Sequence, residues 1–421
     1  MLNRHNIFLL LCHAAHRVAL LAVMLLPVML AACSDDSDNS KPDDNVRNVN
    51  VTLTLSVNPP SNSGSARSKA FTRDAVTTSF DGTWANIDPA EDGKGFENYI
   101  DVSRLHVIFY DKDGNFLAEV QNKLLLPTKD ENIYQVKGNM TISATDAGTD
   151  LNAPVTFGGK VVVYANVDEN TDGNLWRTGL ENVAANATYA YSAPTTAKPD
   201  GSLLSGMTAI PMWGLQDYSS NTIELKGGLY NDLGTIYLLR SMAKVSVHFT
   251  KEMREAGFRF TNIQFNNYNR QGCIAPPYAN IIRLASTKAL SYANSFHVPA
   301  GIMSNSGPLD FLGAVNDTVS LNLYIPEYQN VADATKRTGV ESSSPATITI
   351  GFRRILNGVT TEYNVTTPLR FRDYTNGKPD PTNGYDIVRN HHYRYFILND
   401  HLDLRLEVEP WTVVTHTVKE I

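Results

Sequence analysis

The chain has 421 residues, of which 42% are hydrophobic and 19% charged, a composition that suits about two folded domains. Its formal net charge of −7 argues against a ligand with a phosphate backbone, so we expect no nucleic-acid partner. Of the cysteines Cys12, Cys33 and Cys273, the first two lie in or at the edge of the leader, which excludes a disulfide within the mature chain. We expect Cys273 to be a buried small hydrophobe rather than a reactive thiol.

The N-terminus has the features of an export signal. Arg4 and Arg17 precede an apolar run over 18–29 that is too short for a stable membrane span. The run ends in Leu30-Ala31-Ala32-Cys33, which resembles the lipobox of bacterial lipoproteins. That resemblance implies cleavage between Ala32 and Cys33, acylation (palmitate) of Cys33, and anchoring to outer-membrane lipid through Cys33. The alternative is a chance cysteine after an ordinary signal peptide.

Residues 33–48 are acidic and polar and contain almost nothing apolar, so we expect a solvated, disordered tether after the signal peptide at 1–32. Its start, Ser34-Asp35-Asp36-Ser37-Asp38, resembles the surface-export signal of some Gram-negative lipoproteins. The expected location is therefore the outer membrane, exposed at the cell surface.

Strict alternation follows the tether and predicts a half-buried β-strand over 49–57. The inward positions are Val49, Val51, Leu53, Leu55 and Val57.

Many further short strands separated by turn residues predict an all-β fold of β-sandwiches. The expected strands cover 102–110, 155–167, 235–249, 258–265, 319–325, 346–355, 359–366 and 393–398, and only short pieces such as 251–256 look helical. A stretch rich in Ala, Ser, Thr, Pro and Gly over 189–220 suggests a boundary near 215. The expected domains are 49–215 and 216–421.

The sequence contains no zinc-protease, nucleophile-elbow or P-loop motif, so we expect no enzyme, no cofactor and no metal. The acidic segment Asp111–Asn115 is best interpreted as a hairpin turn. Asp168–Asn174 resembles the start of an EF-hand loop, but Gly179 stands where a bidentate glutamate is required. His391 and His392 are adjacent on a predicted strand and would point to opposite faces, which disfavours a shared metal ion.

The tryptophans Trp84, Trp176, Trp213 and Trp411 are expected to cover a core, and a sugar-stacking platform is the weaker alternative.

Several short segments, taken in order, resemble the fimbrillin family, the subunits of type V pili. With the lipobox, they span the whole chain: Ile210-Pro211-Met212-Trp213-Gly214, Leu239-Arg240-Ser241-Met242-Ala243-Lys244-Val245, Tyr324-Ile325-Pro326-Glu327, Arg389-Asn390-His391-His392-Tyr393 and Val408-Glu409-Pro410-Trp411. Arg240 and Lys244 flank apolar positions and are expected to snorkel or pair.

The resemblance implies two tandem β-sandwich domains of Greek-key type, exported as a lipoprotein and polymerised at the surface into a fimbrium that supports cell adhesion. It also implies that an arginine-specific surface protease cleaves after Arg67 or Arg73 and frees the strand at 49–57. A strand from the C-terminus of another pilus subunit would replace it. For the donor we favour 412–421, with Val414, His416 and Val418 as inward residues, over the alternating segment 402–408.

Three alternatives stay open at this point. One is an uncleaved pilus anchor or a tip subunit, which the motifs do not separate from a stalk subunit. The second is a glycan-binding surface lipoprotein of a nutrient-uptake system, which would need exposed coplanar aromatic side chains. The third is a β-sandwich hydrolase, which would need clustered carboxylates in one cleft.

Overall fold

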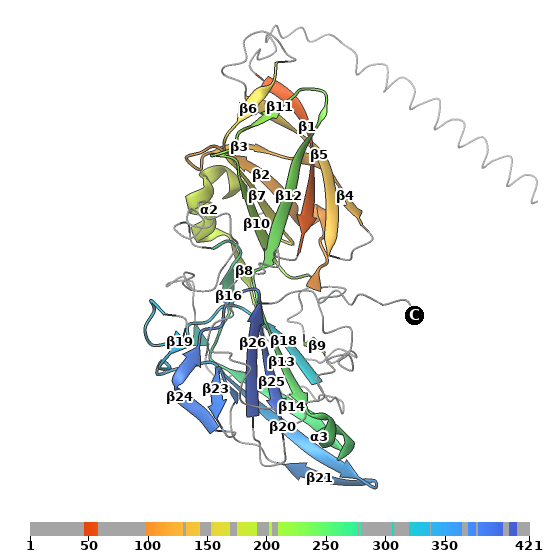
Figure 1. Cartoon of the computed structure of the whole chain (residues 1–421), viewed down its shortest axis with the longest axis vertical. Helices are drawn as coiled ribbons and strands as arrows, with labels where there is room; N and C mark the ends of the chain where they lie inside the picture. The colour runs from red at the N-terminus through yellow and green to blue at the C-terminus, as the bar shows by residue number, and fades with distance from the viewer. Residues whose placement is uncertain are drawn as a thin grey trace, which may run out of the picture. The chain divides into compact units, whose positions relative to one another are not determined.

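The computed structural model describes residues 46–57, 97–128, 132–143, 153–168, 175–191, 202–203, 209–276, 278, 305–306, 320–336, 338–363, 369–375, 378–398 and 404–410. Strands dominate this part of the chain, and they form tandem β-sandwiches (Figure 1), which confirms the predicted all-β fold class. None of the helices in the described ranges is long and apolar enough to cross a membrane.

The first sandwich is built from one sheet of eight strands in the order β3-β2-β7-β10-β12-β1-β5-β4. The strands are β1 (Val46–Ser56), β2 (Leu105–Tyr110), β3 (Phe116–Glu119), β4 (Gln121–Pro127), β5 (Ile133–Ser143), β7 (Lys160–Ala165), β10 (Met212–Asp217) and β12 (Tyr230–Arg240).

Two corners fold this sheet into two layers. β12 pairs with β1 over 230–237 and then with β10 through its last three residues. The edge strands β3 and β4 are separated in sequence by Val120 alone. A single core of buried apolar side chains therefore fills the space between the layers and includes residues of β1, β2, β5, β7 and β12.

Both faces of β2 and β7 are buried, which explains why their sequences are continuous apolar runs. Val107 and Phe109 of β2 face the core that surrounds β1, whereas Ile108 and Tyr110 face a second core. That second core receives side chains from the helices η5 (Leu175–Thr178) and α2 (Leu180–Asn186). The 3-10 helix η4 (Val102–Arg104) leads into β2.

The second sandwich pairs a five-stranded sheet, in the order β26-β25-β13-β18-β9, with a smaller sheet, in the order β14-β20-β21 with β22 beside β20. The aromatic contact between Phe249 and Phe260, whose ring centroids lie 4.1 Å apart, joins them. Their strands are β9 (Ser202–Leu203), β13 (Ala243–Phe249), β14 (Phe258–Asn266), β18 (Ser320–Ile325), β20 (Thr347–Leu356), β21 (Val359–Tyr363), β22 (Leu369–Arg370), β25 (His391–Ile397) and β26 (Leu404–Pro410), with α3 at Lys251–Glu255.

Minor sheets complete the described chain. They are β6 (Val155–Phe157) with β11 (Ile223–Leu225), β8 (Thr188–Ala190) with β16 (Gln271–Cys273), β15 (Tyr268–Asn269) with β17 (Asn305–Ser306), and β19 (Thr338–Gly339) with β24 (Lys378–Tyr385) and β23 (Arg372–Thr375).

Each strand expected from the sequence overlaps an observed one, and the expected helical piece corresponds to α3. The strand expected over 235–249 is two strands, β12 and β13, which belong to different sheets and are separated by Ser241 and Met242. The boundary expected near 215 falls inside β10 of the first sandwich. The change of sheet supports a boundary at Ser241–Met242, which we propose in its place.

Candidate functional site: the first strand and its groove

The strand predicted over 49–57 is present as β1, and its alternating residues point inward as expected. Val49, Val51, Leu53, Leu55 and Val57 are all 0–1% exposed. The intervening positions from Asn48 to Thr54 are exposed or half-buried. The burial pattern therefore follows the period of two that the sequence predicts.

β1 starts earlier than expected, because Val46–Asn48 continue the strand and pair with Thr141–Ser143 of β5. These three residues were assigned to the disordered tether, and that assignment is wrong. Arg47, the charged residue among these three, occupies an inward position and is 2% exposed.

Strands on both sides hold β1. Eleven residues of β1, Val46–Ser56, are in antiparallel register with β5. On its other side β1 runs parallel to β12, from Asn50 opposite Tyr230 to Ser56 opposite Tyr237. Its removal would leave two rows of unpaired backbone groups facing each other across an empty site.

Side-chain contacts add to the backbone pairing. The Asn231 Nδ2 atom donates to the Asn50 carbonyl oxygen at 2.9 Å, and the Thr141 hydroxyl donates to Asn48 Oδ1 at 2.9 Å. At the end of the strand the Val57 amide donates to the Asn132 carbonyl oxygen at 2.9 Å. Each inward apolar side chain contributes roughly 1.5 to 3 kcal/mol relative to exposure in water. β1 is thus held in place by backbone pairing on both sides and by the burial of five apolar side chains.

The remaining predicted sites around this cycle lie outside the described residues. These are Ala32 and Cys33 at the lipobox, Arg67 and Arg73 at the expected cleavage point, and Val414, His416 and Val418 in the favoured donor segment. The other donor segment considered, 402–408, overlaps β26, which pairs with β25 along its whole length.

The fimbrillin-like motif residues Arg240 and Lys244 lie in a buried polar cluster. Both are 0% exposed, so they pair rather than snorkel to water, and the snorkelling alternative is wrong. The Lys244 ammonium lies 2.8 Å from the Glu97 carboxylate, which also accepts a hydrogen bond from the Tyr324 hydroxyl. The Arg240 guanidinium donates to the Glu97 carbonyl oxygen at 2.9 Å. Burial lowers the pKa of Arg240 to about 10.

A second buried pair joins two other motif residues, Glu327 and Arg389. The Arg389 Nη2 atom lies 2.7 Å from Glu327 Oε2, and its guanidinium also donates to the carbonyl oxygens of Cys273 and Ile274 at 3.0 and 2.6 Å. Cys273 is 4% exposed, and burial raises its pKa to about 11, which agrees with an inert thiol. These contacts assign the motif residues a structural role in holding loops of the fold together.

The histidine pair is also structural. His392 is 4% exposed, and its Nε2 atom lies 2.6 Å from the Ser246 hydroxyl. Its neighbour His391 contacts the Arg389 carbonyl oxygen through Nδ1 at 2.8 Å. On β13, burial lowers the pKa of His248 to about 3. Within the described ranges, no group of three or more His, Cys, Asp or Glu side chains is arranged to hold a metal ion.

Trp176 and Trp213 are 1% and 0% exposed and belong to the core, as expected, while Trp84 and Trp411 lie outside the described residues. Asp111–Asn115 forms the predicted hairpin turn between β2 and β3, in which Asp111 Oδ1 accepts from the amides of Asp113 and Asn115 at 2.8 Å. Of the segment Asp168–Asn174, which was compared with an EF-hand loop, only Asp168 lies within the described residues.

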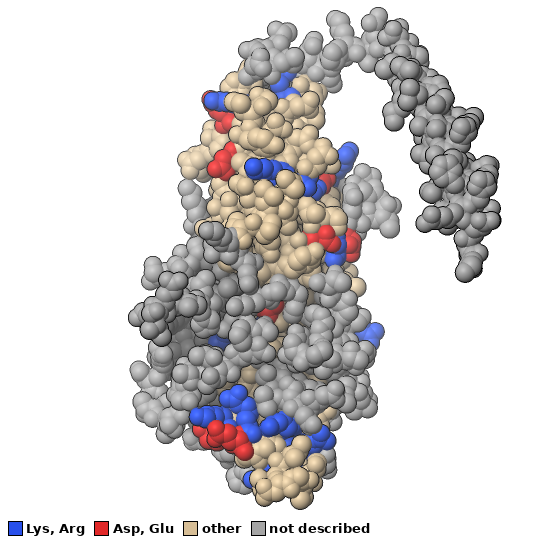
Figure 2. Space-filling view, turned by 90° about the vertical axis from the view of Figure 1, so that its right-hand side faces the viewer, with Lys and Arg blue, Asp and Glu red and all other residues tan. Residues whose placement is uncertain are grey.

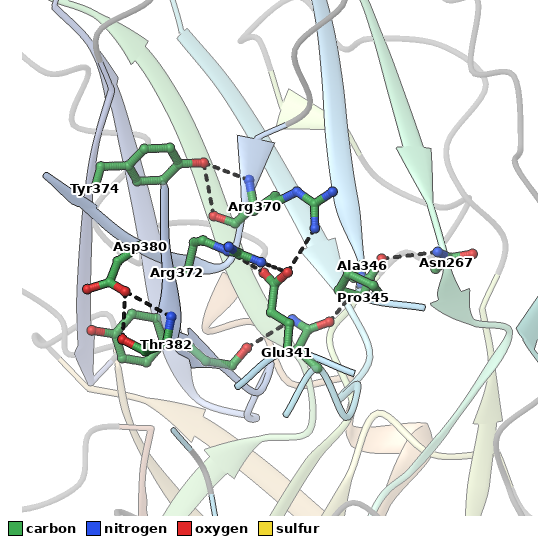
Figure 3. A network of polar contacts seen from close by, with 11 residues as sticks. Asn267, Glu341, Pro345, Ala346, Arg370, Arg372, Tyr374, Asp380 and Thr382 are labelled. Atoms are coloured by element: carbon green, nitrogen blue, oxygen red, sulfur yellow. Dashed lines mark hydrogen bonds and ion pairs between the residues drawn. The ribbon is translucent and has the colours of Figure 1, made fainter. Parts of the chain in front are cut away.

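Charged side chains of the second sandwich pair with one another. Glu341 receives the guanidinium groups of Arg370, at 2.8 Å, and Arg372 (Figure 3). In the same view the Thr382 amide and hydroxyl donate to Asp380 at 2.8 and 2.7 Å. Basic and acidic side chains lie next to each other in several places on the face that Figure 2 shows.

Sequence reasoning missed the partners of these residues. Nothing in the sequence selects β5 and β12 as the walls of the β1 site, because strand pairing depends on the whole topology. Glu97 was also missed. The sequence signal for this cluster is the position of Arg240 and Lys244 within apolar runs. A cation buried there requires a buried acceptor, but the sequence does not show which residue supplies it.

Comparison of the sequence with models of protein families and with curated proteins finds no match. Comparison of the structure with solved structures finds fimbrial proteins. The chain is similar to the C-terminally truncated tip fimbrial protein Mfa3 from Porphyromonas gingivalis, with 13% identity, 86% of this chain and 100% of that chain covered, and a TM-score of 0.44. For a fimbrilin from P. gingivalis W83 the identity is 14%, the coverage 87% and 99%, and the TM-score 0.38.

A putative cell adhesion protein from Parabacteroides distasonis ATCC 8503 has 12% identity, coverage of 87% and 98%, and a TM-score of 0.43. The expected likeness to fimbrial proteins is thus found among solved structures, at low sequence identity.

Proposed function

We propose that this protein is a structural subunit of a cell-surface pilus that is assembled by strand exchange. The observation that carries the proposal is the position of β1. It is the first described strand, it fills the middle of a sheet, and it is joined to the rest of the fold through 58–96, which contains Arg67 and Arg73. A strand at the start of the folded unit can leave after one cut without unthreading any other element.

The energetics of the groove support the same cycle. Cutting the connection turns β1 into a separate segment that is held only by its own contacts. A strand of similar alternation from a second copy or a related subunit would then recover both the backbone ladder and the apolar contacts. The experiments below distinguish such a subunit from an uncleaved anchor or a tip subunit.

The lipid anchor and the surface location belong to the proposal. Cys33→Ser should abolish labelling with a fatty-acid analogue and release the protein from membrane fractions. Continued labelling of that variant would contradict the lipobox assignment.

The central test replaces Arg67 and Arg73 together by alanine. We expect a full-length, lipid-bound monomer, and N-terminal sequencing of surface-extracted wild-type protein should begin at Ser68 or Asp74. Lys69→Ala is the matched control, because it removes a cation from the same segment without removing an arginine. Polymers of normal length from the double variant would overturn the mechanism.

Deletion of 412–421 tests the donor. The truncated protein should still be cleaved and should accept a strand, but it should not extend a polymer. An uncleaved anchor would instead keep β1 and its lipid in wild-type cells, which the same N-terminal sequencing would reveal.

A further inference from the structure

Residues 97–98 contact the two strands that flank β1, β5 and β12, and also Lys244 of β13. Leu55 of β1 is opposite Tyr134 of β5, and Ser56 is opposite Tyr237 of β12. β12 continues past the end of β1 to Arg240. Tyr134 therefore lies opposite the C-terminal part of β1, and Arg240 lies three residues beyond Tyr237, the last residue of β12 that pairs with β1.

Asn98 contacts both walls. The Tyr134 hydroxyl donates to the Asn98 carbonyl oxygen at 2.9 Å, and the Arg240 guanidinium donates to Asn98 Oδ1. Asn98 is 1% exposed. We call Tyr134, Asn98 and Arg240 the Asn98 bridge.

The bridge is itself fixed from several directions. The preceding residue, Glu97, is 0% exposed and is held by the Lys244 ammonium at 2.8 Å. The following residue, Tyr99, accepts a hydrogen bond from Asn166 Nδ2 at its carbonyl oxygen, at 2.7 Å. A hydrogen bond between groups that are already immobile costs little further ordering.

Among the described strand pairings, β5 and β12 are joined to each other only through β1. When β1 leaves, the backbone ladder between the two walls is lost, whereas the Asn98 bridge involves no atom of β1. It is a link between β5 and β12 that survives the removal of the strand.

We propose that Asn98 is a positioning residue that holds β5 and β12 at the spacing of a strand site while the site is empty. This inference rests on the proposed function, since it concerns the state after β1 has been cut free. A site held in this way binds an incoming strand without first having to reassemble its walls. The bridge therefore favours capture of an extended strand that has apolar residues at alternate positions.

Asn98→Ala would remove one of the buried acceptors of the Arg240 guanidinium, which also donates to the Glu97 carbonyl oxygen, and it risks loss of folding, so the test uses Tyr134→Phe. This variant removes only the hydroxyl that reaches Asn98. Tyr328→Phe is the matched control, because the Tyr328 hydroxyl also donates to a backbone carbonyl oxygen, that of Ser344 at 2.7 Å, within the second sandwich. A sequence-specific protease site inserted between Arg67 and Arg73 allows the full chain to be cut while β1 stays bound.

The measurement is the exchange of bound β1 for a fluorescent synthetic peptide of residues 46–57 in the cut protein, together with the unfolding free energy of the uncut protein. We expect Tyr134→Phe to release β1 about 2- to 10-fold faster than wild type and to bind the peptide correspondingly more weakly, as loss of one hydrogen bond implies. Tyr328→Phe should exchange like wild type although the two variants lower the stability of the uncut chain similarly.

The outcomes are distinguishable. If cut wild-type protein never takes up the peptide, the proposed strand exchange fails and the role of Asn98 fails with it. If cut wild-type protein takes up the peptide and Tyr134→Phe exchanges at the rate of Tyr328→Phe, strand exchange stands and the positioning role of Asn98 is wrong.

Discussion

Replacing Leu53 by alanine would open a cavity in the middle of β1. Leu53 is 1% exposed and belongs to the core between the two layers of the first sandwich. Truncation of a buried leucine costs about 2 to 5 kcal/mol, because contacts are lost and the walls relax only in part. Thr54 is the control, since it is the next residue, half-buried on the outward side, and Thr54→Ala should change stability by less than about 0.5 kcal/mol.

Urea denaturation followed by tryptophan fluorescence measures both variants, because Trp176 and Trp213 are buried and will report unfolding. In protein cut between β1 and the rest of the chain, Leu53→Ala should weaken the binding of β1 by at least about 30-fold. If Leu53→Ala and Thr54→Ala were equal within about 0.5 kcal/mol, the inward face of β1 would not contribute the binding energy that strand exchange requires.

Three further predictions concern buried ionisable groups. Because the pKa of His248 is about 3 in the folded chain and about 6.5 when unfolded, the unfolded chain binds the extra proton between these values. The stability that neutral His248 contributes is thus complete above pH 6.5, and the free energy of unfolding falls by about 1.4 kcal/mol per pH unit below it. His248→Gln should reduce this slope in urea titrations between pH 7.5 and 5. An unchanged slope in the variant would contradict this role of His248. In protein expressed without residues 1–33, Cys273 should react with iodoacetamide at pH 8 at least about 100-fold more slowly when folded than in denaturant, and comparable rates would show that the thiol is accessible. Glu97→Ala should destabilise the protein by about 3 to 5 kcal/mol by leaving Lys244 buried without its anion, whereas the exposed Glu181→Ala should have little effect in the same thermal unfolding assay; equal effects would refute the buried pair.

The parts of the fold that follow from local sequence were predictable. The alternation from Val49 to Val57 identifies both the strand and its inward face, because the period of two survives in the folded chain. Runs such as 161–165 identify strands buried on both faces. β5 was not predicted, because Gly138 and Asn139 interrupt its pattern; a Cβ atom at Gly138 would lie 2.5 Å from Val120 Cγ1. The helix α2 has only seven residues, too few to display a helical stripe.

The site could be predicted only in part. The sequence identifies β1 as an alternating, half-buried strand, but it does not identify the strands that flank it, since β12 lies about 180 residues further along the chain and its parallel register with β1 depends on every strand between them. The charged cluster around Glu97 could not be predicted for the same reason. Two cations within apolar sequence require a partner, and only the three-dimensional fold brings the partner from a different part of the chain.

The parallel pairing of β1 with β12 has a consequence for the order of folding. β1 is synthesised before the strands that flank it, yet Asn50 cannot pair with Tyr230 until β12 has been synthesised. Contacts between residues so distant in sequence carry a large loop-closure entropy and form late. We expect the newly made chain to pass through a state in which the other strands of the first sandwich have assembled while β1 is still unpaired. During folding the chain would therefore expose the same empty site that the proposed proteolysis would create, and its own first strand would be the strand that fills it first.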